Sequence, residues 1–246
     1  MPALSLKSVS KEYGGSPALA SVSLEFAENR ITAVIGRSGC GKSTLLKVCN
    51  GLVAPDTGEV QLNGQALDYS NLSPTRRRMG YAVQGTGLFP HLSAGQNITL
   101  LASLAGWEKD RIRQRLKQLL QLTHLEQDQL HKYPHQLSGG QQQRIGLCRA
   151  MMLRPEILLL DEPFAAIDPI TRTDIHRQLL QLHHAEPTTA VLVTHDMREA
   201  MRLADHIVVM EAGRISSTVA TADLQRDNPG KDPEELLQLL LREAAP

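Results

Sequence analysis

The stretch Gly36-Arg37-Ser38-Gly39-Cys40-Gly41-Lys42-Ser43 decides how this sequence folds. It matches the phosphate-loop pattern G-x-x-x-x-G-K-S/T, in which glycines let backbone N–H groups wrap a chain of phosphates. A helix that begins here directs the positive end of its dipole at the same phosphates. We expect Lys42 to reach the β- and γ-phosphates of ATP and the Ser43 hydroxyl to hold Mg²⁺. The predicted ATP-binding set is Gly36, Arg37, Ser38, Gly39, Cys40, Gly41, Lys42, Ser43 and Thr44.

The residues on either side of this loop predict a strand and a helix. Ile31–Ile35 is a short, nearly all-apolar run, typical of a strand buried on both faces, and a helical stretch runs from the loop to near Gly51. Further out, residues 4–9 and 22–26 alternate as strands do, and Gly58–Leu62 leads into the hairpin turn Asn63-Gly64. We assign these strands to an antiparallel β subdomain.

The middle of the chain, about residues 92 to 152, has a helical pattern. Ile112, Leu116, Leu119 and Leu120 form one apolar stripe, and Asp110 is a candidate cap for their helix. We interpret the Lys, Arg and Gln residues between them as the solvated face. The pattern predicts a helical lobe inserted into an α/β core.

The core resumes with Ile157–Leu160, a buried strand that ends in Asp161 and Glu162. Carboxylates at the carboxyl edge of a parallel sheet lie where ligands bind. We expect Asp161 to hold Mg²⁺ through water and Glu162 to polarise the water that attacks the γ-phosphate.

Further strands and helices follow to the end of the chain. Asp168-Pro169 predicts a capped helix, and the later elements are Val191–Val193 (strand), Met197–Ala204 (helix), Ile207–Met210 (strand) and Pro233–Leu241 (amphipathic helix). This alternation predicts an α/β fold: a phosphate-loop NTPase core with a parallel sheet, an antiparallel β subdomain and the helical lobe.

A second helix start suited to anions occurs at Leu137-Ser138-Gly139-Gly140-Gln141. Ser138 can cap the helix, and the two glycines leave backbone amides open. Taken alone, the pattern also fits an ordinary capped helix. The chain thus has two helix starts suited to binding phosphate. This favours a dimer in which each phosphate loop faces the other subunit's Ser138–Gln141 across a shared ATP.

Together these motifs resemble the nucleotide-binding domain of ATP-binding-cassette (ABC) transporters, from about residue 3 to 220. In that family Leu137–Gln141 corresponds to the signature motif. The resemblance implies an ATPase that uses ATP and Mg²⁺, forms a homodimer or pairs with another cassette around two ATP molecules, and drives a separate permease.

The resemblance also implies roles for individual residues. Tyr13 corresponds to the aromatic that stacks on adenine, although such a tyrosine is usually a packing residue. Gln84 corresponds to the glutamine that reaches Mg²⁺ and the attacking water. Asp168, in Ala165-Ala166-Ile167-Asp168, corresponds to the loop at the dimer seam, and His195 to the histidine that contacts the γ-phosphate. The implied catalytic set is Glu162, His195, Gln84 and Lys42, and the implied metal set is Ser43, Gln84 and Asp161.

Two segments resemble importers in particular. The loop from Gln84 to Pro90 corresponds to the dock for a permease helix, and Tyr133-Pro134-His135-Gln136 leads into the signature as in importers. Importers also imply a separate solute-binding protein. Residues 79–84 and 167–172 are similar to importers of glycine betaine, choline and other osmoprotectants. The transported solute itself is not readable from this chain.

Composition limits the other functions that the chain can have. The 246 residues carry 26 basic and 26 acidic side chains, so nothing predicts a nucleic-acid partner, and we interpret Arg76–Arg78 as a solvated loop. Cys40, Cys49 and Cys148 lack metal-ligand spacing and fit reduced thiols. With no apolar run of membrane-spanning length and no export signal, we expect a cytoplasmic protein bound to the inner membrane face through its permease.

We divide the sequence into an ABC ATPase domain, 1–222, and a short helical tail, 223–246. Within the domain the core is 1–91 and 153–222, and the helical lobe is about 92–152. One alternative is an ABC-type ATPase switch without a permease, and another is a nucleotide kinase. Translation and repair members of the first class usually have two cassettes or a long coiled coil, and a kinase needs no Leu-Ser-Gly-Gly-Gln.

Overall fold

The computed structural model describes residues 2–165 and 167–243 of the chain. It divides into two compact units: the first combines Met1–Arg76 with Thr189–Pro246, and the second is Arg77–Thr188. The domain boundaries inferred from the sequence stay a prediction.

An antiparallel sheet opens the first unit. Its strands are β1 (Leu4–Tyr13), β2 (Ser16–Phe26), β4 (Thr57–Leu62) and β5 (Gln65–Ala66), in the order β2-β1-β4-β5. Leu62 pairs with Gln65, so Asn63 and Gly64 form a two-residue turn, and both have positive φ as such a turn requires. This sheet is the predicted antiparallel β subdomain.

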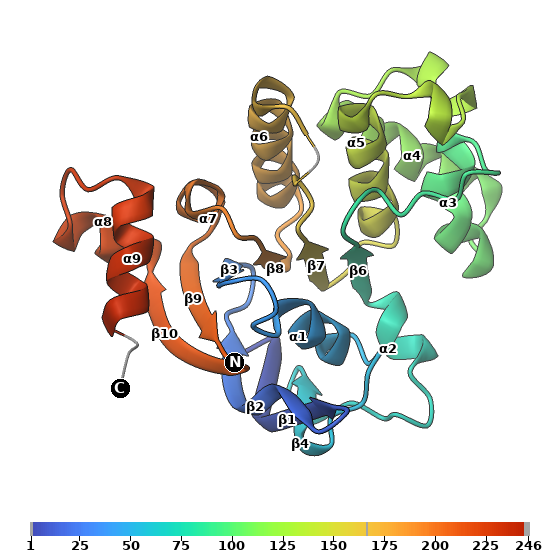
Figure 1. The fold of residues 1–246 in the computed structure, drawn as a ribbon. Helices are drawn as coiled ribbons and strands as arrows, with labels where there is room; N and C mark the ends of the chain where they lie inside the picture. Colours follow the sequence, from blue (N-terminus) through green and yellow to red (C-terminus); the bar gives the residue numbers. More distant parts are fainter. Residues whose placement is uncertain (1, 166, 244–246) are drawn as a thin grey trace. The chain divides into compact units, whose positions relative to one another are not determined.

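A second sheet in the first unit carries the phosphate loop (Figure 1). Strand β3 (Ile31–Ile35) is buried along its whole length and pairs in parallel with β8 (Thr189–Val193) and β9 (His206–Glu211). Strand β10 (Arg214–Ala220) adds an antiparallel edge to β9. The helices of this unit are α1 (Lys42–Cys49), α7 (Met197–Leu203), α8 (Thr221–Asp227) and α9 (Pro233–Glu243).

The second unit holds the predicted helical lobe (Figure 1). Its parallel strands β6 (Met79–Ala82) and β7 (Ile157–Asp161) are adjacent in space but far apart in sequence. The segment between them forms α3 (Ala94–Leu104), α4 (Lys109–Thr123), two 3₁₀ turns, η1 (Gln127–His131) and η2 (Pro134–Gln136), and α5 (Gly139–Met151). Helix α6 (Pro169–Ala185) follows β7. The α/β prediction with an inserted helical region is thus confirmed.

Helix α4 corrects two predictions. Its N-cap is Glu108, so Asp110 lies in the first turn and is not the cap. Arg115 is not on the solvated face: only 3% of the residue is exposed, and its guanidinium bonds to Glu186 and to the Met151 and Met152 carbonyls. The apolar periodicity does not reveal Arg115, because an arginine can be buried at any position where acceptors satisfy its hydrogen-bond donors.

The Arg76–Arg78 cluster begins in a short helix and makes specific hydrogen bonds. Helix α2 (Ser73–Arg77) contains Arg76, whose Nη2 donates to the Gly51 carbonyl at 2.7 Å. Arg78 forms two hydrogen bonds of 2.7 Å with the Glu156 carboxylate. The segment is therefore helical and not a loop, whereas Arg76 and Arg77 are exposed to solvent as predicted.

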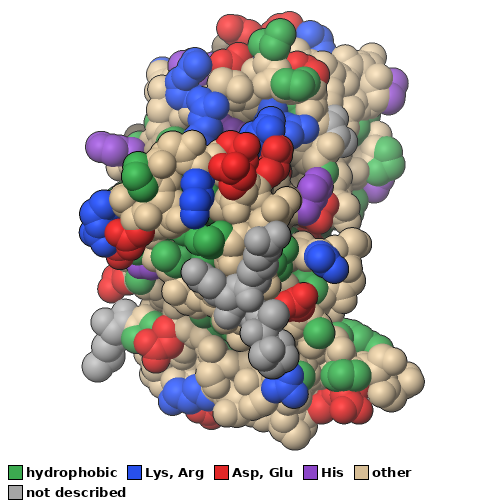
Figure 2. Space-filling view, turned by 60° about the vertical axis from the view of Figure 1, so that its left-hand side comes forward, with side chains coloured by type: hydrophobic (Ala, Val, Ile, Leu, Met, Phe, Trp, Pro, Cys, Tyr) green, Lys and Arg blue, Asp and Glu red, His purple; other side chains and the backbone are tan. Residues whose placement is uncertain are grey.

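Charges of both signs share the surface. On the face drawn in Figure 2, Lys and Arg side chains lie among Asp and Glu side chains and do not form one basic area, in keeping with the zero net charge. Among the described residues, no helix has the length and apolar character needed to cross a membrane.

Candidate ATP site and signature helix

The phosphate loop connects β3 to α1, and Lys42 points back into it. The Lys42 Nζ donates to the carbonyls of Gly36 at 2.8 Å and Arg37 at 3.0 Å, and the residue is only 6% exposed. A buried ammonium encircled by its own loop is placed to meet an anion that enters the loop.

Glycine is required at two positions of the loop. A Cβ atom on Gly36 would overlap the Met210 carbonyl, and one on Gly41 would overlap the Ala18 carbonyl. Gly41 is also the N-cap of α1, in the left-handed region, and no side chain caps the helix. The loop therefore combines close backbone approach with a helix start that side chains leave open, which fits the triphosphate of ATP.

Asp161 lies at the carboxyl end of β7 and is 5% exposed. The Tyr81 hydroxyl donates to its Oδ2 at 3.4 Å. Burial, and then the charge of Asp161, raise the pKa of Tyr81, so the phenol stays a neutral donor. Tyr81 was not predicted as a site residue, and only its place on the strand beside β7 reveals the contact.

Glu162 follows directly and has an unusual backbone. Its φ is 44°, the left-handed region that residues other than glycine seldom adopt. The Gln84 Nε2 donates to Glu162 Oε2 at 3.3 Å. Two predicted catalytic residues, 78 positions apart, therefore meet in the second unit. The Glu162 carboxylate and the Gln84 amide can order a water molecule between them.

The signature segment forms the start of α5. The Ser138 hydroxyl accepts from Gln141 N at 3.3 Å, and the Gln141 side chain accepts from Ser138 N at 2.9 Å. This capping box confirms the predicted cap. Gly139 is exposed, whereas Gly140 is buried where a Cβ would overlap the Thr171 side chain of α6. Gly140 thus serves helix packing, and Gly139 is the exposed glycine of the pair.

Asp168 caps α6, as predicted. Its Oδ1 accepts from Thr171 N at 3.0 Å, and hydrogen bonds from Thr171 lower the pKa of the Asp168 carboxyl. Of the loop Ala165–Asp168, Ala166 lies outside the described residues.

Tyr13 and His195 belong to the first unit with the phosphate loop. Tyr13 ends β1 with 49% of its surface exposed, so it is not the packing residue that such a tyrosine usually is. Its ring lies 5.7 Å from Lys11 Nζ. His195 is exposed and directly follows the buried Thr194 at the end of β8. The predicted site residues thus form two sets, one in each unit.

Comparison with known proteins agrees with these motifs. The ABC transporter family matches residues 19–165. The chain belongs to the ABC transporter family.

Curated relatives of this ABC cassette include importer subunits. It is 46% identical over 207 residues to the glycine betaine uptake system ATP-binding protein YehX of Escherichia coli, covering 84% of this chain and 67% of that protein. It is 42% identical over 230 residues to the glycine betaine/carnitine/choline transport ATP-binding protein OpuCA of Bacillus subtilis, covering 93% and 60%. The chain therefore spans about three fifths to two thirds of the length of these relatives.

A solved structure has the same fold. The dimeric, post-hydrolysis ATP-binding cassette MJ0796 bound to ADP and Pi aligns with a TM-score of 0.80 and 32% identity, covering 89% of this chain and 98% of that one.

Two residues of the cassette that the sequence did not single out connect α5 to the loop after Gln84. The Gln142 side chain accepts from Thr86 Oγ1 at 3.2 Å and donates to the carbonyls of Pro134 and Leu137. Arg149 Nη1 donates to the Gly87 carbonyl at 2.8 Å. Both project from α5 toward a glycine-containing loop, a relationship that helical periodicity alone does not show.

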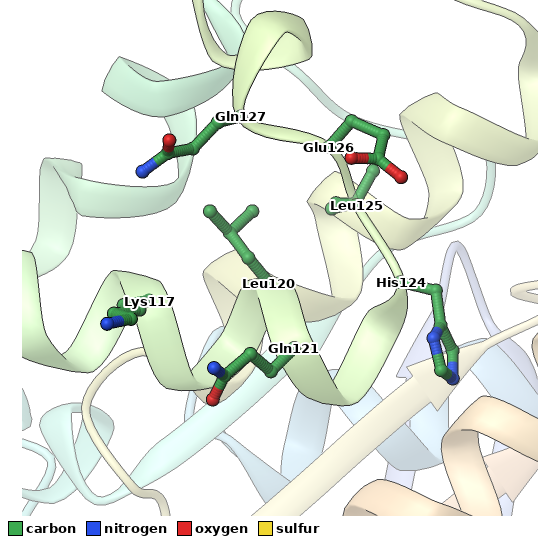
Figure 3. A pocket seen from close by; sticks show the side chains of 7 residues that line it. All are labelled: Lys117, Leu120, Gln121, His124, Leu125, Glu126 and Gln127. Atoms are coloured by element: carbon green, nitrogen blue, oxygen red, sulfur yellow. The ribbon is translucent and has the colours of Figure 1, made fainter.

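A hollow of about 530 Å³ in the second unit is not part of this site. It lies where α4 ends and η1 begins, with Leu120 at its centre and polar side chains around it, as Figure 3 shows. Its one carboxylate is Glu126, which already belongs to the capping box of η1. The hollow therefore offers no chemistry that competes with the phosphate loop.

Proposed function

We propose that this cassette binds Mg²⁺-ATP and hydrolyses it to ADP and phosphate. The observation that carries the proposal is the buried Lys42 ammonium inside a loop that only glycine can build. Membership of the ABC family supports it.

Each predicted residue has a role in this reaction. Lys42 neutralises charge on the β- and γ-phosphates, while Ser43, Gln84 and Asp161 are the residues that would hold Mg²⁺, which supplies further charge neutralisation. Glu162 polarises the attacking water, and His195 contacts the γ-phosphate. Tyr13 stacks on adenine. Hydrolysis needs positioning more than covalent chemistry, so these contacts suffice.

We further propose that two cassettes close around two ATP molecules. Each phosphate loop faces the other cassette's Ser138, Gly139, Gly140 and Gln141, and Asp168 lies near the seam. The dimeric form of MJ0796 supports this arrangement. The partner is an identical chain or a paired cassette.

The cassette would power an importer through a separate permease. Phe89 supports a dock at Gln84–Pro90: 43% of the residue is exposed, while its backbone N and O both bond to the buried Asn97 side chain. The names of the curated relatives favour glycine betaine, choline or carnitine as the solute. Such an importer implies a solute-binding protein and a place on the inner membrane face.

Phosphate release by the purified chain with Mg²⁺-ATP tests the hydrolysis. The Lys42→Ala variant is the control for contaminating ATPases, and equal rates in both would refute the proposal.

ATP-dependent uptake of labelled glycine betaine, by vesicles containing the permease, tests the transport. If Lys42→Ala left uptake unchanged, the chain would be an ATPase that does not drive the importer.

A further inference from the structure

The segment that carries His195 is fixed by a buried pair of polar side chains. The Thr194 hydroxyl donates to Glu199 Oε2 at 2.6 Å. Thr194 is 2% exposed and Glu199 is 5% exposed, so water has little access to this hydrogen bond. Thr194 directly precedes His195, and Glu199 lies on α7, four residues after it.

Thr194 is also tied to the strand that leads into the phosphate loop. Its backbone N donates to the Val34 carbonyl at 3.2 Å, which extends the pairing of β8 with β3 by one residue. Strand β3 ends at Ile35, next to Gly36. The residue before His195 is therefore bonded to the strand that leads into the phosphate loop.

The residue after His195 is held by the same hydroxyl. Asp196 N donates to Thr194 Oγ1 at 3.1 Å, and the Asp196 side chain accepts from Arg198 N at 2.8 Å to cap α7. A hydroxyl hydrogen rotates freely unless an acceptor fixes it. Because Glu199 takes that hydrogen, a lone pair of the Thr194 oxygen stays directed at the Asp196 N–H.

Packing alone does not explain a glutamate at position 199. Helix α7 already buries Met197, Ala200 and Leu203, and a carboxyl group on the same inner side costs free energy unless it is hydrogen-bonded. An apolar residue of similar size would not need a hydrogen-bond partner there. Its hydrogen bond beside an exposed histidine indicates a positioning role.

We propose that Glu199 is a positioning residue for His195: by fixing the Thr194 hydroxyl, it holds the backbone on both sides of His195 and so presents the imidazole to the γ-phosphate. This inference rests on the proposed function. Misplacement of a reacting group by about 1 Å can cost about 100-fold in rate. Loss of the pair should therefore reduce turnover without weakening ATP binding.

The pair can be broken from either side with matched variants. Glu199→Met and Thr194→Val remove the hydrogen bond and keep side-chain volume, whereas Glu199→Gln and Thr194→Ser keep an acceptor and a hydroxyl. We expect the first two to lower kcat for ATP about tenfold with KM within about twofold, and the second two to keep most of the rate. Arg202→Gln, an exposed change on the same helix, is the control.

Two further measurements separate positioning from general structural support. In a His195→Ala background, Glu199→Met should lower kcat no further, because it acts through the imidazole. Amide exchange at Asp196 should become about tenfold faster in Glu199→Met and Thr194→Val, since its hydrogen-bond acceptor is lost or released.

The inference is overturned if His195→Ala reduces kcat but Glu199→Met and Thr194→Val do not, or if Glu199→Met lowers kcat equally with and without His195. Unchanged exchange at Asp196 also overturns it, and this readout needs no ATPase activity. Failure of the proposed function would give a different result. The wild-type chain would then release no phosphate, or the His195→Ala variant would hydrolyse ATP at the wild-type rate.

Discussion

The Arg115 guanidinium donates two hydrogen bonds to the Glu186 carboxylate, one of them 2.7 Å long, from a position where the arginine is almost wholly buried. Its Nη2 also donates to the Met151 carbonyl at 2.6 Å. Met151 ends α5, and Glu186 is the C-cap of α6. One side chain of α4 therefore ties together the carboxyl ends of two other helices of the second unit.

Removing that arginine should destabilise the chain. Arg115→Met leaves the Glu186 carboxylate and a helix-end carbonyl without their main donor, and we expect the free energy of unfolding to fall by about 3 kcal/mol in urea denaturation. The control is Arg113→Met on the exposed side of the same helix, which should change it by less than about 0.5 kcal/mol. Similar effects of both variants would show that the buried pair contributes no more than surface charge.

Glu162→Gln should separate ATP binding from hydrolysis. Glutamine keeps the size and the hydrogen bonding to Gln84 but loses the carboxylate, so turnover should fall by about 10²–10⁴-fold while ATP still binds. Steady-state phosphate release and nucleotide-binding titration measure the two effects. Glu28→Gln, on the exposed surface of the first unit, should match the wild type. A Glu162→Gln rate near wild type would assign water activation to another group.

Ser138→Arg should prevent the ATP-dependent dimer. In the Glu162→Gln background with ATP, we expect a dimer on size-exclusion chromatography because ATP is not consumed. An arginine at Ser138 blocks the start of α5 and removes its cap, so the chain should run as a monomer that still binds ATP through its own phosphate loop. Ser103→Arg, at an exposed position of α3, should leave the dimer intact. A monomer in every variant would remove the shared-ATP arrangement.

Phe89→Ala should weaken the permease contact while leaving the chain folded. Asn97 holds the loop through the Phe89 backbone, so truncating the ring leaves that clamp in place. We expect an unchanged ATPase rate and melting temperature for the isolated subunit. The free energy of binding to the permease should weaken by about 2 kcal/mol or more. Less permease should then co-purify with the variant. Leu52→Ala, which removes an apolar side chain that is 52% exposed in the first unit, should have no such effect. A fall of several degrees in melting temperature with normal uptake would make Phe89 a packing residue.

Two buried thiols should make stability fall at alkaline pH. Burial raises the pKa of Cys49 and of Cys148 from the ordinary value of 9.0 to about 12. The unfolded chain then releases these protons first, so the folded state loses stability as pH rises from about 9 toward 12. Between pH 8 and 10, each thiol should lower the free energy of unfolding by about 1.4 kcal/mol, as measured by denaturant titration. The Cys49→Ala/Cys148→Ala variant should lose less over this interval, and an equal loss would contradict the assignment.

Local patterns predicted most of the fold and both glycine-rich motifs. The loop around Lys42, the cap at Ser138 and the turn at Asn63-Gly64 depend on residues close in sequence, because backbone conformation and helix starts are set over a few positions. The all-apolar run at Ile31–Ile35 marked a strand buried on both faces. By itself, then, the sequence determined the α/β class, the helical region and the residue types of the ATP site.

The tertiary structure decided which polar groups meet. Gln84 with Glu162, Tyr81 with Asp161, and Arg115 with Glu186 join positions 71 to 80 residues apart. Periodicity assigns a side chain to a buried or exposed face but does not name its partner, and so it placed Arg115 on the wrong face. The left-handed backbone of Glu162 is likewise set by its surroundings, because nothing in a glutamate side chain favours positive φ.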